Sequence, residues 1–113
     1  MAITIQREKG VTVLIVDETF VSHEGEQEFD EKSREVLAEG VDLVLDVSQV
    51  PFIDSRRLAT IVICYKRATE ASLRMVVVGV SGAILETLRM SRLDTILDLV
   101  PTRREALTRL RQE

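Results

Sequence analysis

Cysteine, histidine, glycine and aromatic residues are all scarce in this sequence. Its 113 residues include one cysteine, one histidine, five glycines and no tryptophan, and aromatic residues make up only 4%. Because Cys64 is alone, no disulfide forms within the chain, and its apolar neighbours predict a buried thiol. The few glycines form neither a G-x-x-x-x-G-K-S/T loop nor a G-x-G-x-x-G loop, so a glycine-rich nucleotide site is not expected.

The shortage of catalytic side chains argues against an enzyme. Nucleophilic catalysis needs a nucleophile, a base and usually an orienting group in contact with one another. Ser55 stands beside Asp54, but no base candidate accompanies them. The histidine, His23, precedes a glutamate-rich stretch at 24–28, which is more typical of a solvated surface than of a metal site. We therefore expect no catalysis, no cofactor and no metal.

Long apolar runs and an excess of positive charge are missing as well. No apolar stretch approaches the roughly 18 to 20 residues of a membrane span. The N-terminus has no basic segment followed by an apolar core. The formal net charge of −4 gives no general attraction to nucleic acid or to anionic membranes. We expect a cytoplasmic protein that neither binds nucleic acid nor inserts into a membrane.

Apolar periodicity runs through the whole chain, and 113 residues suffice for one core. Apolar residues make up 45% and charged residues 30%, the balance of a globular domain. The pattern predicts helices starting near residues 24, 55, 82 and 101, and strands near 3–6, 11–16, 43–47, 74–79 and 96–100. This ββαβαβαβα order predicts an α/β fold with a mixed, mostly parallel sheet of four to five strands and about four helices. We expect a single domain over residues 1–113.

The same periodicity predicts which helix faces are buried. The expected buried positions, helix by helix, are Phe29, Ser33, Val36 and Leu37; Leu58, Ile61, Val62 and Tyr65; Ile84, Leu85, Leu88 and Ser91; and Ala106, Leu107 and Leu110. Phe20 and Val21 are expected to anchor the polar loop at 17–23, and Thr102 with Glu105 predicts a capping box at the last helix.

The connection between the strand at 43–47 and the second helix is the main candidate for a functional site. Asp54 and Ser55 are both good N-cap residues, which places Ser55 at a helix N-terminus. Unpaired backbone N–H groups and the helix dipole would stabilise a phosphate there. As an N-cap alone, Ser55 would contribute about 1 kcal/mol. From these residues alone, a structural serine and a modified serine both stay open.

The run from Leu45 to Ser55, LDVSQVPFIDS, resembles the signature of STAS domains of the bacterial anti-sigma factor antagonist type. The run MVVVGVS from Met75, and the segment from Leu85 to Ile96, resemble the family's fourth strand, third helix and following turn. The similarity spans essentially the full chain. Its specific part is the Asp-Ser pair after the D-x-S-x-V stretch, whereas the rest is general α/β patterning.

The resemblance implies a binding protein without enzymatic activity. In such proteins the serine matching Ser55 is phosphorylated by the partner anti-sigma factor, a serine kinase, and dephosphorylated by a serine phosphatase. The unmodified form captures the anti-sigma factor and frees the sigma factor for transcription or stress signalling. The phosphorylated form releases it. Asp54 and Ser55 match this motif directly.

Three arginines depart from the family pattern. Arg56 and Arg57 stand where a small residue and then a glycine are common, and Arg92 stands where glycine is frequent. On the first helical turn, Arg56 and Arg57 are expected either to pair with a phosphate, to attract an acidic partner, or simply to be solvated. An arginine in place of glycine also changes how closely a partner backbone approaches.

The predicted partner surface combines this turn with the outer side of the second helix. Its residues are Asp54, Ser55, Arg56, Arg57, Ala59 and Ile63. An exposed isoleucine beside a small apolar residue is typical of a contact patch, although single apolar surface residues are common. The sequence leaves the oligomeric state open, a homodimer included.

An alternative function would use the turn at Ser55 for docking alone. A STAS-like accessory subunit of an ABC-type lipid transporter would dock the turn on an ATPase subunit without phosphorylation. Phosphate gained by the protein but not by Ser55→Ala favours the anti-sigma role. Co-purification with an ATPase and no phosphate favours the transporter role.

Overall fold

The computed structural model describes residues 3–8 and 10–111. Its strands form one five-stranded sheet in the order β1-β2-β3-β4-β5. Their bounds are β1 Ile3–Glu8, β2 Val11–Val16, β3 Asp42–Asp46, β4 Met75–Val78 and β5 Asp98–Val100. β1 and β2 form an antiparallel hairpin, and every other neighbouring pair is parallel. The mixed, mostly parallel sheet and the α/β class are confirmed.

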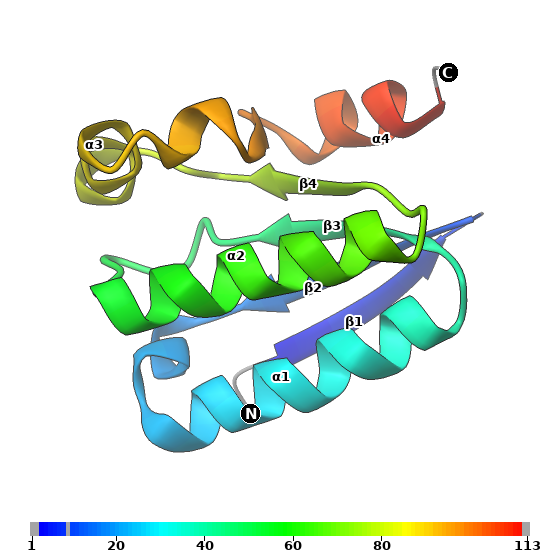
Figure 1. Cartoon of the computed structure of the whole chain (residues 1–113), viewed down its shortest axis with the longest axis horizontal. Helices are drawn as coiled ribbons and strands as arrows, with labels where there is room; N and C mark the ends of the chain where they lie inside the picture. The colour runs from blue at the N-terminus through cyan, green and yellow to red at the C-terminus, as the bar shows by residue number, and fades with distance from the viewer. Residues whose placement is uncertain (1–2, 9, 112–113) are drawn as a thin grey trace.

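Helices cover both faces of this sheet. They are α1 His23–Ala38, α2 Ser55–Glu70, α3 Gly82–Met90 and α4 Arg103–Arg111. In Figure 1, α1 and α2 lie side by side in front of the sheet. The buried side chains place α3 on that same face and α4 on the opposite one. The chain is therefore one compact three-layer α/β unit.

The inner strands are apolar at consecutive positions because both of their faces are covered. Leu43 and Leu45 of β3 pack into the core beneath α1, α2 and α3, whereas Val44 packs into the core beneath α4. In β4, Val77 and Val76 divide between the two cores in the same way. This explains why β3 and β4 lack the alternating pattern of a half-exposed strand.

The helix faces agree with the sequence pattern on α1 and partly on the other helices. The predicted residues that are buried are Phe29, Ser33, Val36, Leu37, Leu58, Ile61, Ile84, Leu88 and Ala106. Val62 and Tyr65 are only half-buried, because the buried stripe of α2 continues instead through Cys64 and Ala68. Ser91 is exposed, contrary to the prediction, because α3 ends at the preceding residue.

Two short 3-10 helices also interrupt the predicted loops. The first, η1 Glu18–Val21, lies in the polar loop and buries Phe20 completely, as predicted. The second is η2 Leu93–Thr95. The last strand therefore begins at Asp98 and not near residue 96. At the start of α4, the Glu105 N–H donates to Thr102 Oγ at 3.2 Å, which is the expected N-terminal cap.

Candidate functional site

The connection from β3 to α2 is fixed where it leaves the sheet. Asp46 ends β3 and is 5% exposed. Its Oδ1 accepts hydrogen bonds from the Ser48 N–H at 2.9 Å and from the Ser48 hydroxyl at 2.6 Å. Its Oδ2 accepts from Arg103 of α4 at 3.2 Å. A buried carboxylate thus holds the D-x-S stretch in one conformation.

A second connection, from β4 to α3, packs closely against the β3–α2 connection. Gly79 has a φ of +84°, which favours glycine. A Cβ at this position would lie 2.6 Å from the Ser48 Cβ and 2.8 Å from the Ser48 nitrogen. Glycine therefore allows the two connections to touch at the carboxyl edge of the parallel strands, which is where α/β proteins commonly place their functional residues.

Ser55 is the first residue of α2 and is exposed. The N-cap is Asp54, whose Oδ1 accepts a hydrogen bond from the Arg57 N–H at 2.8 Å. The prediction that Ser55 is the N-cap is therefore wrong. Because Asp54 already caps the helix, the Ser55 side chain makes no hydrogen bond to any described residue. The hydroxyl is thus presented to solvent where an inner strand leads into a helix, as the sequence predicted.

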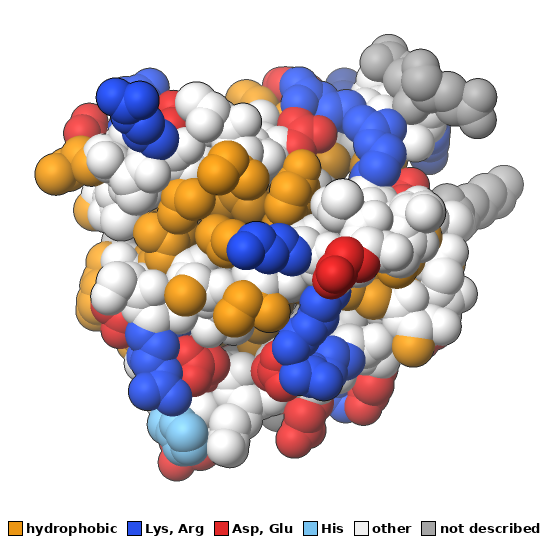
Figure 2. Space-filling view, in the orientation of Figure 1, with side chains coloured by type: hydrophobic (Ala, Val, Ile, Leu, Met, Phe, Trp, Pro, Cys, Tyr) orange, Lys and Arg blue, Asp and Glu red, His pale blue; other side chains and the backbone are white. Residues whose placement is uncertain are grey.

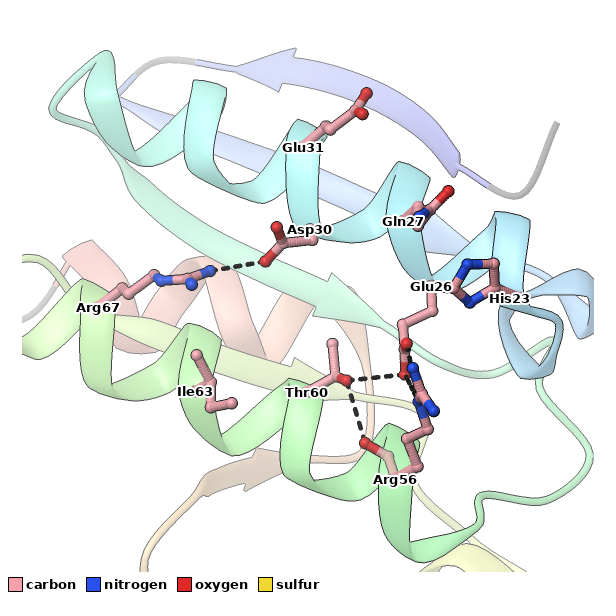
Figure 3. Close-up of a pocket in the computed structure, with 9 residues that line it drawn as sticks. All are labelled: His23, Glu26, Gln27, Asp30, Glu31, Arg56, Thr60, Ile63 and Arg67. Atoms are coloured by element: carbon pink, nitrogen blue, oxygen red, sulfur yellow. Dashed lines mark hydrogen bonds and ion pairs between the residues drawn. The ribbon is translucent and has the colours of Figure 1, made fainter.

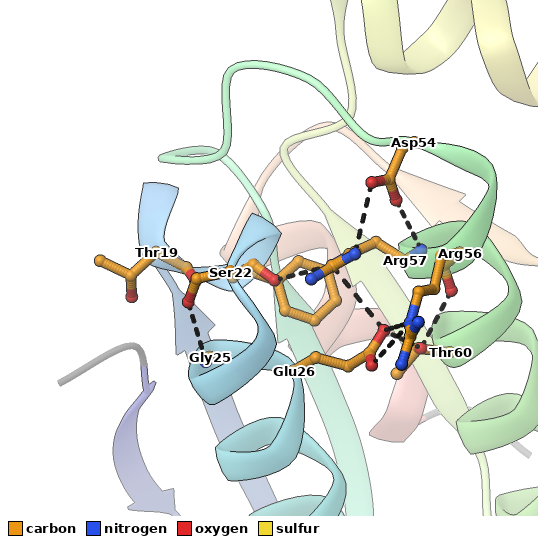
Figure 4. Close-up of polar contacts among 9 residues, drawn as sticks. Thr19, Ser22, Gly25, Glu26, Asp54, Arg56, Arg57 and Thr60 are labelled. Carbon is orange, nitrogen blue, oxygen red and sulfur yellow. Dashed lines mark hydrogen bonds and ion pairs between the residues drawn. The ribbon is translucent and has the colours of Figure 1, made fainter.

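Arg57 is not a surface residue, although all three interpretations of the sequence placed it at the surface. Its side chain is 9% exposed and lies between α2, η1 and α1 (Figure 4). Nε donates to the Phe20 carbonyl at 3.2 Å, and Nη1 donates to Asp54 Oδ2 at 3.3 Å. Nε also lies 3.7 Å from Glu26 Oε2. Backbone and carboxylate acceptors on three sides make it possible to bury the guanidinium here.

Arg56 points outward and is 65% exposed. Its Nε donates to Glu26 Oε1 at 3.0 Å and to Oε2 at 3.3 Å. Glu26 Oε2 also accepts the Thr60 hydroxyl at 3.2 Å. The sequence did not point to Glu26, since it lies about thirty residues from Arg56 in an acidic stretch that reads as solvated. Only the packing of α1 against α2 brings them together.

Ala59 and Ile63 lie on the outer side of α2, as predicted, and Ile63 is 47% exposed. In Figure 2, apolar side chains gather over α2 and between α2 and the α3–η2 segment. Ile63 also lines a groove of about 410 Å³ between α1 and α2, with charged residues at both ends (Figure 3). At the far end, Arg67 donates to Asp30 at 2.8 Å and holds the pKa of that carboxyl below its ordinary value.

His23 lines the same groove and is exposed. Within residues 3–8 and 10–111, no three His, Cys, Asp or Glu side chains are grouped closely enough to hold a metal ion. Over the same residues, no helix has both the length and the apolar character needed to cross a membrane.

Comparison with known proteins identifies the fold family. The sequence model of the STAS domain matches residues 2–106. The chain belongs to the STAS domain family. Among curated proteins, none matches this STAS domain at a significant level.

Solved structures share the STAS fold at low sequence identity. TM1081 from Thermotoga maritima superposes with a TM-score of 0.88 at 22% identity, covering 97% of this chain and 95% of that one. An anti-sigma-factor antagonist (STAS) domain protein from Planctomyces limnophilus gives 0.83 at 21%, covering 97% and 98%. The Bacillus cell fate determinant SpoIIAA in its phosphorylated form gives 0.72 at 14%, covering 96% and 98%.

Arg92, the third arginine that stands where the STAS resemblance implies glycine, has a backbone conformation that favours glycine. Arg92 has a φ of +61°, in the left-handed region, directly after the end of α3. Its N–H donates to the Arg89 carbonyl at 3.1 Å. The turn is therefore retained, while an exposed arginine side chain is added to it.

Proposed function

We propose that this STAS domain is an anti-sigma factor antagonist whose binding is switched by phosphorylation of Ser55. The unmodified protein captures an anti-sigma factor that is also a serine kinase, and the phosphorylated protein releases it. The observation that carries this proposal is the exposed Ser55 hydroxyl, which has no hydrogen-bond partner in the described chain and starts a helix capped by Asp54.

The chemistry of the switch follows from the position of that hydroxyl. The kinase transfers the γ-phosphoryl group of ATP: a bond forms between Ser55 Oγ and phosphorus, the bond to ADP breaks, and the hydroxyl proton is released. The phosphate adds about −1.5 to −2 charges at neutral pH. The α2 N–H groups and helix dipole stabilise it within this protein. An interface packed on the unmodified turn would have to bury that charge, which costs several kcal/mol.

The remaining roles come from the family type. A serine phosphatase resets the switch, and the outcome is regulated sigma-factor-dependent transcription or stress signalling in the cytoplasm. The chain itself acts by binding and carries out no catalysis. The similarity to SpoIIAA, a structure determined in a phosphorylated form, supports a modified state within this fold.

Intact mass measurement tests this proposal. The protein is incubated with the anti-sigma kinase of its host and ATP, and we expect the mass of one added phosphate. Ser55→Ala should gain none. Ser81→Ala is the matched control, because Ser81 is an exposed serine at the N-terminus of α3 that makes no capping hydrogen bond. Phosphate on Ser55→Ala, or co-purification with an ATPase and no phosphate on any form, would overturn it.

A further inference from the structure

Arg56 and Arg57 are neighbours with very different freedom to move. Arg57 is 9% exposed and donates to Asp54 and to the carbonyl of the buried Phe20, so moving it would leave that carbonyl unpaired. Arg56 is 65% exposed, and among the described residues its side chain pairs only with Glu26. Arg56 can therefore turn toward a new anion by giving up contacts with Glu26 alone, whereas Arg57 cannot turn without leaving the Phe20 carbonyl unpaired.

Glu26 is the group that holds Arg56 in place. Its side chain is 13% exposed, so its charge is poorly screened by solvent. It accepts two contacts from Arg56 and one from Thr60, and lies near Arg57. In the unmodified protein, Glu26 and Asp54 balance the two arginines, and the turn at Ser55 presents no unpaired cation.

We propose that Glu26 competes with a phosphate on Ser55 for Arg56. In the unmodified protein Arg56 lies on Glu26, and in the phosphorylated protein its guanidinium is shared between Glu26 and the phosphate. This inference rests on the proposed phosphorylation of Ser55 and adds a positioning residue to it. Glu26 sets how much of the added negative charge stays unneutralised at the turn, and that residual charge repels the partner.

Arg56 and Arg57 stand in place of the small residue and glycine that the STAS resemblance implies. A lone arginine beside a phosphoserine would pair with it and weaken the switch, since charge-assisted hydrogen bonds between guanidinium and phosphate are strong. A half-buried carboxylate that already holds this arginine opposes that pairing. Arg56 can therefore stand beside Ser55 without cancelling the effect of phosphorylation.

The test measures the second pKa of the phosphate by ³¹P NMR. Phosphoserine is placed at position 55 by genetic encoding, so no kinase is needed and the result is independent of whether a kinase modifies this serine. A nearby cation favours the dianion and lowers the pKa. We expect Arg56→Gln to raise the phosphate pKa by about half a unit. Glu26→Gln should lower it, because Arg56 is then released to the phosphate.

The chain offers a matched ion pair as a control. Arg67 and Asp30 join the same two helices at the other end of the groove, so Arg67→Gln and Asp30→Asn should leave the phosphate pKa unchanged. Asp54 and Arg57 stay constant in all variants, and the ring-proton signals of His23, which lines the same groove, are followed separately. The proposal is overturned if Arg56→Gln matches Arg67→Gln, or if Glu26→Gln fails to lower the pKa.

Discussion

Cys64 lies on the side of α2 that packs against the core, and it is 1% exposed. Burial raises the pKa of its thiol to about 11, because the thiolate would lose its solvation, while a hydrogen bond with Ser33 of α1 acts in the opposite direction. The sequence correctly predicted a buried thiol from the apolar neighbours. It did not predict Ser33 as a neighbour, since the two residues lie on different helices.

The raised pKa makes stability depend on pH in the alkaline range. Above pH 9.0 the unfolded thiol ionises while the folded thiol does not. The contribution of Cys64 to the free energy of unfolding is therefore fully present below about pH 9 and is lost as the pH rises to about 11. The total loss is about 2–3 kcal/mol. We expect Cys64→Ala to show a smaller fall in the free energy of unfolding over this range, measured by denaturant titration at each pH. Equal slopes for the two proteins would contradict this.

At the scale of the elements, α1 and α2 are joined by charged contacts at both ends of one groove. Arg67 reaches Asp30 at one end, and Arg56 and Arg57 meet Glu26 at the other. Glu26 and Asp30 are one helical turn apart on α1, so a single face of that helix supplies both carboxylates. The start of α2, where Ser55 lies, is thus tied to α1 and η1 as well as to the sheet.

This arrangement predicts different costs for the two adjacent arginines. Arg57→Ala leaves the Phe20 carbonyl without its donor and Glu26 with one cation fewer, which should lower the free energy of unfolding by about 2–4 kcal/mol. Arg56→Ala removes an ion pair whose arginine is 65% exposed and should cost less than about 1 kcal/mol. Denaturant unfolding compares them, with Arg67→Ala as a second exposed pair. Similar losses for Arg56→Ala and Arg57→Ala would contradict the assignment of Arg57 as structural.

The elements were predictable from the sequence wherever one local pattern determined them. The apolar runs of β3 and β4 and the heptad-like face of α1 were enough to give the order of strands and helices. Ser55 was placed correctly at a strand-to-helix step, because Asp54 and the apolar spacing after it are local signals. Arg57 was misplaced because its burial depends on the Phe20 carbonyl and on Glu26, contacts about thirty residues away or more that no local pattern reveals.

At the scale of the whole molecule, the exposed apolar side chains are unevenly placed. The large ones among the described residues are Phe52, Ile63, Met90 and Ile96. Phe52 lies in the β3–α2 connection and Ile63 on α2, on the same side of the sheet as the Ser55 turn. A partner that touches Ser55 and extends along α2 would reach Ala59 and then Ile63, since these lie one and two helical turns beyond the serine.

That geometry gives a binding prediction for the outer side of α2. Ile63→Glu places a charge on this surface and should weaken capture of the anti-sigma factor at least about tenfold, because a buried unpaired charge costs more than 1.4 kcal/mol. The melting temperature should stay unchanged, since Ile63 is 47% exposed. Met90→Glu is the matched control, because Met90 is 84% exposed at the end of α3 and outside α2. A pulldown in which Ile63→Glu binds as well as Met90→Glu would exclude this face from the interface, and binding would then depend on the Ser55 turn alone.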